Sequence, residues 1–311
     1  MRIAFVGKGG SGKTTLASLF AAHVAERGRP VLAIDADLNQ HLGPALGFSD
    51  IPPRTLGTEQ AWLKRLLHGT RTDVAPEDLI KTTPPARGSR VFRGLGELRR
   101  ELAGFVRERN GVALLNVGEQ TDEDTAVRCY HSKTGAVELL LNHAVDGAGE
   151  YLVVDMTAGA DAFASGLYDL FDLTVLAVEP TLPSLGVFRQ YAGRAKALGV
   201  RVAAVGNKVL DDADRAFLRA ELGDDLLGCV SLTPFVRARE RGEARPLSTL
   251  EPENRAVLDA VLTLLDRQEK DWPRYFSRIT EIHRKNAASW GNAARGTDLA
   301  RAIDPSFSYL D

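Results

Sequence analysis

The residues whose types and spacing most clearly specify a chemistry lie near the N-terminus, where residues 7–15 read Gly-Lys-Gly-Gly-Ser-Gly-Lys-Thr-Thr. They fit the pattern G-x-x-x-x-G-K-[ST] of a phosphate-binding loop. The apolar residues 3–6 before the loop predict a buried strand, and residues 16–24 after it carry apolar side chains at helical spacing. Strand, glycine loop and helix in this order form the context in which such a loop binds nucleotide phosphates.

Each residue type in this loop has a physical role in holding phosphate. The candidate nucleotide-binding residues are Gly7, Lys8, Gly9, Gly10, Ser11, Gly12, Lys13, Thr14 and Thr15. The glycines carry no side chain that would keep backbone N–H donors from a triphosphate, and they permit positive φ angles. A helix that begins at Lys13 adds the positive end of its dipole. We expect Lys13 to reach the β- and γ-phosphates, the Thr14 hydroxyl to ligate Mg²⁺, and Thr15 to lie near the α-phosphate.

Carboxylates follow two further predicted strands. Residues 31–34 are apolar and lead into Asp35-Ala36-Asp37, and residues 151–154 lead into Asp155. Because parallel strands of an open α/β sheet present the residues at their carboxyl ends to the ligand crevice, both sites are expected to face the nucleotide. Asp155 has the position from which a carboxylate holds Mg²⁺ directly or through water. For Asp37, capping of the next helix is an alternative.

Predicted strands alternate with predicted helices along the chain. This alternation indicates an α/β fold, a doubly wound and mostly parallel sheet of the P-loop NTPase class. We expect one such domain over residues 1–265, with an insertion around residues 48–110, and a helical C-terminal tail over residues 266–311. The aromatic residues of the tail predict that it packs back on the domain. A membrane-targeting amphipathic helix is the alternative, although Asp304-Pro305 interrupts any helix near its end.

Composition narrows the class of protein. The formal net charge of −2 over 311 residues provides no general attraction to nucleic acid or acidic membranes. No run of about 18 apolar residues and no secretory signal are visible, so we expect a chain without an integral membrane segment. The two cysteines, Cys129 and Cys229, argue against a disulfide framework and favour a cytoplasmic location.

The loop as a whole, with Lys8 directly after its first glycine, resembles the deviant loop K-G-G-x-G-K-T of the MinD/ParA, arsenical-pump and nitrogenase iron protein superfamily, a SIMIBI-like group. The resemblance implies an ATP hydrolase that forms a nucleotide-dependent homodimer, in which Lys8 reaches the partner subunit's nucleotide. It also implies that Asp37 orients or activates the attacking water, so Lys8, Lys13 and Asp37 are candidate catalytic residues. The stretch from Asp155 to Gly159 resembles switch II, where Gly159 would let a backbone N–H approach the γ-phosphate.

The same resemblance places base recognition later in the chain. It implies that Asn207, after a strand predicted at residues 200–205, binds the adenine edge, for which its amide offers both a donor and an acceptor. Lys208, Thr233 and Pro234 are further candidate nucleotide-binding residues, because the loop that contains Thr233 and Pro234 packs on the base in that superfamily. Guanine-specific loops typically read N-K-x-D, and this chain has no aspartate at the fourth position, which favours ATP.

The segment around Cys129 is similar to one in the nickel-insertion ATPases of carbon monoxide dehydrogenase, the CooC type. There, a Cys-x-Cys pair binds a metal between subunits, whereas the second position here is His131. Cysteine and histidine both ligate Zn²⁺ and Ni²⁺, and two residues per chain would need a two-fold axis to complete a tetrahedral set. A structural or incidental role for Cys129 and His131 is the alternative.

The leading hypothesis is therefore a Mg-ATP-dependent dimeric switch of the CooC type that assists metal-centre maturation of an unknown client. One alternative is a regulatory or positioning ATPase of the MinD/ParA kind, which acts through partners on membrane or DNA. Another is a small-molecule kinase with the same loop, similar to dethiobiotin synthetase. Metal content and binding to liposomes or DNA would separate the first two, and steady phosphate release without an acceptor would argue against the kinase.

Overall fold

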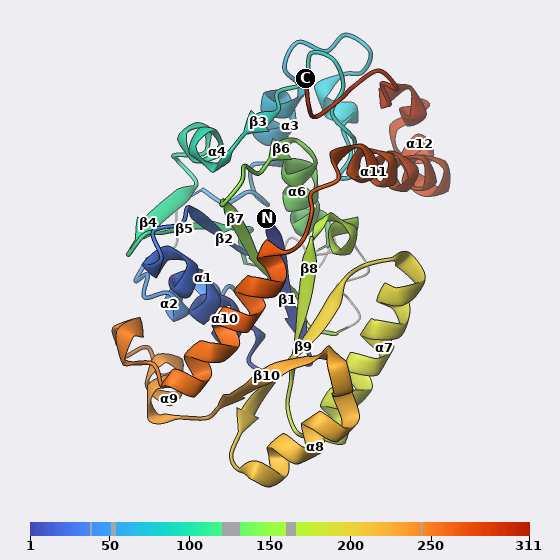
Figure 1. The fold of residues 1–311 in the computed structure, drawn as a ribbon. Helices are drawn as coiled ribbons and strands as arrows, with labels where there is room; N and C mark the ends of the chain where they lie inside the picture. Colours follow the sequence, from blue (N-terminus) through green and yellow to red (C-terminus); the bar gives the residue numbers. More distant parts are fainter. Residues whose placement is uncertain (38, 51–53, 120–130, 160–165, 244) are drawn as a thin grey trace.

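The computed structural model of the chain describes residues 1–37, 39–50, 54–119, 131–159, 166–243 and 245–311. At its centre, eight strands of the described residues form one sheet (Figure 1). In order across the sheet, these strands are β10 (Leu226–Ser231), β9 (Val202–Val209), β8 (Leu173–Val178), β1 (Arg2–Gly7), β7 (Tyr151–Asp155), β2 (Val31–Asp35), β5 (Val112–Asn116) and β4 (Val106–Arg109). Neighbouring strands are parallel except at one edge, where β4 pairs antiparallel with β5.

Helices connect the strands and cover the sheet. The α-helices of the described chain are α1 (Lys13–Glu26), α2 (Leu42–Ala45), α3 (Gln60–His68), α4 (Leu95–Glu101), α6 (His131–Asn142), α7 (Leu182–Leu198), α8 (Asp212–Leu222), α9 (Pro234–Glu240), α10 (Pro252–Asp266), α11 (Trp272–Asn286) and α12 (Asn292–Arg295). Short 3₁₀ turns lie at η1 (Pro76–Asp78), η3 (Gly166–Leu170), η4 (Gly223–Asp225), η5 (Leu247–Thr249) and η7 (Leu299–Ala302), and a π-helical turn lies at η6 (Ala287–Gly291). A second, two-stranded parallel sheet joins β3 (Phe92–Arg93) to β6 (Ala144–Val145).

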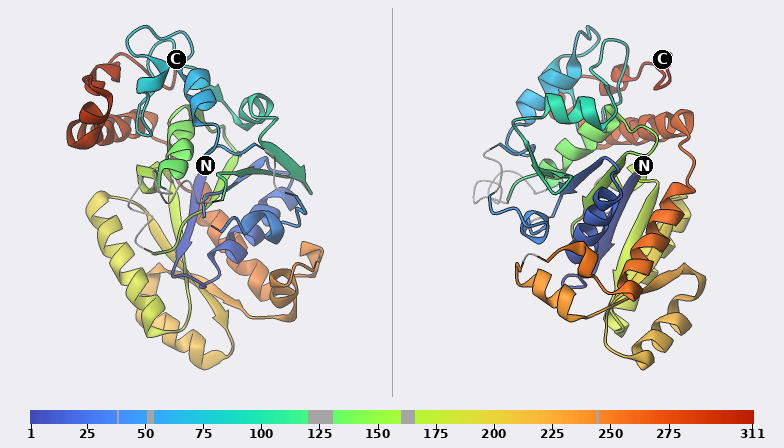
Figure 2. Two further views of the ribbon diagram at one scale, coloured as in Figure 1. Left: turned by 180° about the vertical axis from the view of Figure 1, so that it is seen from behind. Right: turned by 60° about the vertical axis from the view of Figure 1, so that its left-hand side comes forward.

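Alternate residues of each central strand enter two separate hydrophobic cores. On β2, Leu32 and Ile34 pack in the core shared with α3, α6, α7 and α11, while Val31 and Ala33 pack in the core shared with α1 and α10. This separation follows from the two-residue period of a strand, which points successive side chains to opposite faces. The sheet is thus covered on both faces, and the predicted doubly wound, mostly parallel α/β fold is confirmed (Figures 1 and 2).

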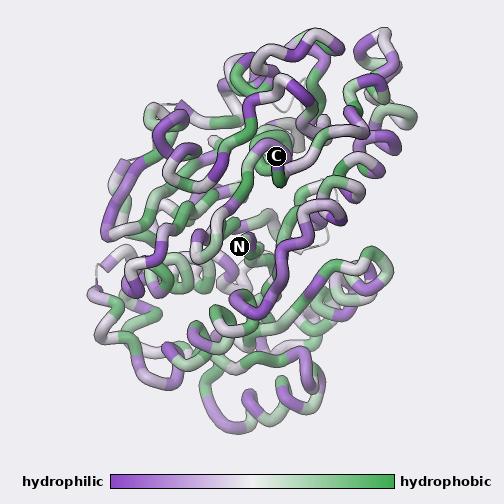
Figure 3. Tube along the Cα trace, turned by 45° about the horizontal axis from the view of Figure 1, so that its top comes forward, coloured by the Kyte–Doolittle hydropathy of each residue, from purple (hydrophilic) through white to green (hydrophobic). Residues whose placement is uncertain are grey.

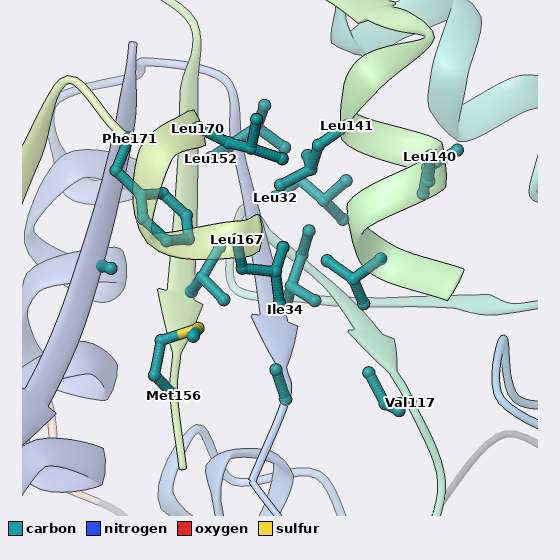
Figure 4. Close-up of a cluster of buried hydrophobic side chains, with 14 of the residues drawn as sticks. Leu32, Ile34, Val117, Leu140, Leu141, Leu152, Met156, Leu167, Leu170 and Phe171 are labelled. Atoms are coloured by element: carbon teal, nitrogen blue, oxygen red, sulfur yellow. The ribbon is translucent and has the colours of Figure 1, made fainter. Parts of the chain in front are cut away.

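The interior of the first core shows why the strands read as continuous apolar runs. Leu141 of α6 and Leu167 of η3 lie against Leu32 and Ile34 of β2 (Figure 4). Hydrophobic residues are concentrated along the central strands, whereas the outer helices alternate hydrophilic and hydrophobic residues (Figure 3). Strands buried on both faces need apolar residues throughout, and surface helices need them on one face only.

The register of the sheet brings the ends of its central strands together. β1 lies between β7 and β8, and Phe5 pairs with Asp155 while Gly7 pairs with Ala177. On the other side of β7, Asp35 is level with Asp155. The glycine loop and the two aspartates therefore emerge at the same edge, as expected for the carboxyl ends of parallel strands.

The C-terminal residues lie against the segment that was predicted to be an insertion (Figure 1). Arg71 donates a hydrogen bond to the carbonyl oxygen of Ala302 at 2.8 Å, and Arg93 donates one to that of Tyr309 at 2.8 Å. Ile80, Ala287 and Leu299 form a small apolar cluster between the two segments. No helix in the described part of the chain is both long and apolar enough to cross a bilayer.

Candidate functional site: a phosphate-loop cavity

The glycine loop connects β1 to α1 in the way that its sequence predicts. Gly10 and Gly12 have φ values of 80° and 88°, in the left-handed region that favours glycine. A Cβ atom at Gly12 would also lie 2.1 Å from Nδ2 of Asn207. Gly12 is the N-terminal cap of α1 and has no side chain to accept a bond from the first helical N–H groups, which leaves them facing an anion site.

Lys13, at the end of this loop, forms an ion pair with Asp37. Both side chains are largely buried, with exposed fractions of 12% and 7%. Burial opposes the charged form of Lys13, but the carboxylates of Asp155 and Asp37 outweigh it and raise the pKa of Lys13 above its ordinary value. Lys13 is therefore held as a cation, and a phosphate in the site could replace Asp37 as its ion-pair partner.

Thr14 and Asp155 form the second polar contact of the site. The Thr14 hydroxyl donates a hydrogen bond of 2.6 Å to Oδ2 of Asp155, while Oδ1 of that buried carboxylate has no hydrogen-bond partner among the described residues. Burial raises the pKa of Asp155 to about 7, although Lys13 and the Thr14 hydroxyl both lower it. A buried carboxylate oxygen without a partner beside a threonine hydroxyl fits a hard cation such as Mg²⁺, which prefers oxygen ligands.

Asp35, the last residue of β2, holds the backbone beside the site through hydrogen bonds. It is fully buried, and its carboxylate accepts backbone hydrogen bonds from Leu42 at 2.8 Å and from Asp37 at 3.3 Å. Burial and the nearby charge of Asp155 raise its pKa well above the ordinary value. Of the two aspartates after β2, Asp35 shapes the turn into α2 and Asp37 faces the cavity.

A cavity of about 480 Å³ opens at this edge of the sheet. Its lining residues are Gly9, Gly10, Gly12, Lys13, Thr14, Thr15, Asp37, Asn39, His41, Thr157, Ala158, Lys208 and Glu240. The phosphate loop and both segments after β2 and β7 thus contribute to one pocket of the size that small-molecule ligands occupy.

Three charged residues brace the outer side of the loop. Lys208 donates hydrogen bonds to the carbonyl oxygen of Gly10 and, at 3.0 Å, to Glu179. The other carboxylate oxygen of Glu179 lies 3.8 Å from Nζ of Lys8, whose side chain is 41% exposed. Glu179 follows β8 directly, so the rule that located Asp155 at the end of its strand also applies to Glu179, whose role at the loop the sequence interpretation missed.

The base-binding residues suggested by the resemblance lie partly away from the cavity. The strand predicted at residues 200–205 continues to Val209, so Asn207 lies inside β9 and not after it, because the pairing with β10 extends to this point. The buried Asn207 amide donates a 2.8 Å hydrogen bond to the carbonyl oxygen of Ser11. Thr233 caps α9 and Pro234 is its first residue, and neither is among the described residues that line the cavity.

Glu240, at the end of α9, was not predicted. It lines the cavity and accepts a hydrogen bond of 3.4 Å from the Thr15 hydroxyl. An exposed glutamate on a short helix carries no local signal of a site, and only the packing of α9 brings it here.

Three other predicted positions, Gly159, Cys129 and His131, lie beside or outside the described residues. Gly159 has a φ of 67°, in the left-handed region, and directly precedes residues 160–165, which lie outside the described part. Cys129 also lies outside the described residues, and His131 is the first residue of α6 with no side chain described. Among the residues that are described, no cluster of three or more histidine, cysteine, aspartate or glutamate side chains could hold a metal ion.

Comparison with known proteins shows relatives of this chain in sequence and in fold. The carbon monoxide dehydrogenase accessory protein CooC of Rhodospirillum rubrum is 27% identical over 243 residues, which cover 78% of this chain and 87% of that protein. The fold is also similar to a ParA family ATPase from Chlorobium tepidum, with a TM-score of 0.58 and 15% identity over 85% of this chain and 98% of the other. The septum site-determining protein MinD of Pyrococcus horikoshii, complexed with Mg-ADP, has a TM-score of 0.51 and 18% identity over 85% and 95%.

The family-level match covers more of the chain than the site alone. Residues 3–245 match the CbiA family, described as the CobQ/CobB/MinD/ParA nucleotide binding domain. This range includes the glycine loop, both aspartate turns and the helix that carries Glu240. The chain therefore belongs to the CobQ/CobB/MinD/ParA nucleotide-binding family and is an ATPase of that family.

Proposed function

We propose that this ATPase is a Mg-ATP-dependent, dimeric molecular switch that assists another protein. The observation that carries the proposal is that Lys13, Thr14 and Asp37 line one cavity beside the glycine loop. The buried Asp155 carboxylate lies directly behind them and accepts a hydrogen bond from Thr14. The relative in Rhodospirillum rubrum is an accessory protein of carbon monoxide dehydrogenase, which supports a role in service of another enzyme.

The ion pair between Lys13 and Asp37 suggests how the nucleotide would engage the site. The β- and γ-phosphates of ATP would compete for the Lys13 ammonium, which would free the Asp37 carboxylate to accept a hydrogen bond from the attacking water. Thr14 and Asp155 would hold Mg²⁺, which offsets the charge of the phosphates when bound with ATP. The free Oδ1 atom of Asp155, and the Mg-ADP bound to the MinD of Pyrococcus horikoshii, support this assignment.

Adenine recognition by Asn207, with Lys208, Thr233 and Pro234 nearby, remains part of the proposal. One N–H of the Asn207 amide holds the loop carbonyl of Ser11, which would couple the base side of the site to the phosphate side. Lys208 holds Gly10 in the same way. Both contacts tie carbonyl groups of the glycine loop to the end of β9.

Variants of the two charged partners test this function directly. Lys13→Ala should abolish ATP binding and hydrolysis, because it removes the cation that the phosphates require. Asp37→Asn should bind a fluorescent ATP analogue at least as tightly as the wild type, since a competing ion pair is lost, while phosphate release falls by about 100-fold or more. The exposed Lys285→Ala variant serves as the control and should match the wild type. Unchanged turnover in Lys13→Ala would contradict the proposal.

The dimer and the metal are the finer parts of the proposal. The Lys8 side chain is 41% exposed, and its ammonium lies 3.8 Å from Glu179, beyond hydrogen-bonding distance, which would leave it accessible to a second subunit. In the proposed ATP-loaded dimer it would contact the partner subunit's nucleotide. Cys129 and His131 of two subunits would together provide four ligands, a set that suits Zn²⁺ better than tetrahedral Ni²⁺.

One sample can test both parts. The mass by light scattering and the metal content by elemental analysis are measured on protein loaded with a non-hydrolysable ATP analogue. Wild type should be a dimer with about one zinc or nickel ion per two chains, besides any magnesium bound with the nucleotide. Lys8→Ala should remain monomeric, and Cys129→Ser should dimerise without zinc or nickel. A wild-type protein that stays monomeric with the ATP analogue bound would remove the role of Lys8. Equal and negligible zinc and nickel in wild type and Cys129→Ser would instead favour a regulatory ATPase of the MinD/ParA kind.

A further inference from the structure

A second cavity, of about 470 Å³, lies between α3, the η1 turn, α6 and the C-terminal turn around α12. None of the residues that line it also lines the phosphate-loop cavity. The helices α3, α6 and α12 gather in the upper part of the view in Figure 1. The pocket thus joins the segment predicted as an insertion to the tail, and the proposed ATPase chemistry makes no use of it.

The floor of this pocket is apolar and deep. Leu63, Ile80, Ala136 and Leu139 form it, and their exposed fractions are only 0%, 2%, 4% and 2%. Leu63, Ala136 and Leu139 are members of the main hydrophobic core on this face of the sheet. Because these side chains are already almost fully buried, the apolar surface removed from water would be mainly that of the ligand, at about 25 cal/mol for each Å².

The rim, in contrast, is cationic. Lys64, Arg65, Lys81 and Arg295 line the pocket together with a single carboxylate, that of Glu77. The Lys81 ammonium lies 3.8 Å from Glu138, longer than a hydrogen bond, and Arg65 and Arg295 are exposed at the ends of α3 and α12. Lys64 already donates a 3.1 Å hydrogen bond to the carbonyl oxygen of Glu77, and Lys81 pairs with Glu138. The cations that the rim most clearly presents to a ligand are therefore the exposed Arg65 and Arg295.

An exposed aromatic ring completes the wall. Trp290 is 42% exposed and lies in the π-helical turn at residues 287–291, a type of turn that is often found at functional sites. Its indole N–H donates a hydrogen bond of 3.3 Å to Oδ1 of Asn286, which holds the ring in place. Of the large hydrophobic side chains exposed among the described residues, Trp290 alone lines this pocket.

We propose that this pocket binds a small organic molecule that carries one anionic group, a carboxylate, sulfonate or phosphate, on an apolar and preferably aromatic body. The body would lie on the floor beside Trp290, and the anion would meet the arginines and lysines of the rim. The volume falls in the range of about 300–1,000 Å³ that small-molecule pockets occupy. A protein partner fits less well, because a specific interface buries about 1,200 Å² or more, far more than the lining of this pocket offers.

Two matched dyes test the proposal on the full chain. The probe 8-anilinonaphthalene-1-sulfonate carries an anion on an aromatic body, and N-phenyl-1-naphthylamine has the same body without the sulfonate. Saturating Mg-ADP is included so that the nucleotide site is not available to either dye. Fluorescence titration should show one sulfonate dye bound per chain. The neutral dye should bind at least about tenfold more weakly, because a hydrogen bond to a charged group is lost.

Variants then locate the binding site. The double variant Arg65→Gln, Arg295→Gln should weaken the sulfonate dye about tenfold and leave the neutral dye unchanged. Ala61→Phe, at an exposed position of α3 that lines the pocket, should weaken both dyes by filling it. The double variant Arg100→Gln, Arg267→Gln removes two charges from exposed arginines that do not line the pocket, so it is the charge-matched control and should change neither. Thermal melting temperatures equal to that of the wild type would show that all variants are folded.

Two results would overturn the proposal. If Ala61→Phe and the double arginine variant bind the sulfonate dye as the wild type does, the dye lies elsewhere on the chain. If the wild type binds both dyes equally well, the rim does not select an anion. The pocket would then take apolar molecules without regard to charge, and the proposed anion specificity would be wrong.

Discussion

Glu138 is a carboxyl group buried in the middle of α6, outside the nucleotide site. Its side chain is 2% exposed, accepts a hydrogen bond of 3.1 Å from the backbone N–H of Gly166, and lies 3.8 Å from the Lys81 ammonium. Burial raises its pKa to about 7, although Lys81 and the Gly166 N–H both lower it. A carboxylate with one distant cation is therefore costly to keep ionised in this position.

The pH dependence of stability follows from this raised pKa. In the unfolded chain the group ionises near its ordinary pKa of 4.5, so between about pH 4.5 and 7 the folded chain holds the proton that the unfolded chain has lost. Stability falls across this window as pH rises, and the full cost is present above pH 7. Glu138→Gln removes the titration, so its advantage in free energy of unfolding over the wild type should grow from pH 5 to pH 8, by at most about 3 kcal/mol.

Urea unfolding at pH 5 and at pH 8 measures this difference. The exposed Glu281→Gln variant removes the same charge from a group whose pKa is already lowered by Lys285, so it should show no pH-dependent advantage between these values. An advantage of Glu138→Gln that is the same at both pH values would show that Glu138 does not titrate in this window.

At the scale of the element, the glycine loop combines two constraints that differ from one glycine to the next. Gly12 has a left-handed φ of 88°, and a Cβ there would lie 2.1 Å from the Asn207 amide. Gly9 has no positive φ, and a Cβ there would meet no atom within 4 Å. The consensus pattern requires Gly12 and not Gly9, and the structure shows the physical reason.

The pair of alanine variants separates the two cases. Gly12→Ala should lower the thermal melting temperature by several degrees, because a left-handed residue with a Cβ costs about 1–2 kcal/mol and Asn207 must also move away from Ser11. Gly9→Ala should melt within about one degree of the wild type in the absence of nucleotide. Equal melting temperatures for the two variants would mean that the loop can rearrange around Gly12 without loss.

At the scale of the whole molecule, aromatic residues fasten the C-terminal tail to the domain. Tyr309 is 2% exposed, and its hydroxyl donates a hydrogen bond to the carbonyl oxygen of Asn142 at the end of α6. Its ring centroid lies 4.9 Å from that of Trp272 and 5.2 Å from that of Phe307. Arg2 of β1 lies over the rings of Trp272 and Tyr275, so the tail also contacts the first strand of the sheet.

Loss of this aromatic cluster should therefore destabilise the whole domain. Tyr309→Ala should reduce the free energy of unfolding by about 3–5 kcal/mol, as expected for a large aromatic side chain removed from a packed site. The next residue provides the control, since Leu310 is 69% exposed and Leu310→Ala should change stability by no more than about 0.5 kcal/mol. Denaturant unfolding curves of both variants measure the difference. Equal effects would show that the tail contributes little to the stability of the domain.

The local features of this protein can be predicted from short stretches of its sequence. Residues 7–15, the carboxylates after residues 31–34 and 151–154, and the alternation of apolar strands with helices were sufficient to predict the glycine loop, the aspartates at the strand ends and the α/β class. These features depend on neighbouring residues only, because backbone conformation and helix or strand periodicity are set by side chains a few positions apart.

Which distant residues meet depends on the tertiary structure. The sequence does not show that β1 lies between β7 and β8, yet this order brings Thr14 within 2.6 Å of Asp155. In the same way, only the packing of α9 brings Glu240 to Thr15, and only the docking of the tail against α3 and α6 forms the pocket beside Trp290. Contacts of this kind depend on how complete faces of helices and sheets fit together, and no single stretch of sequence contains that information.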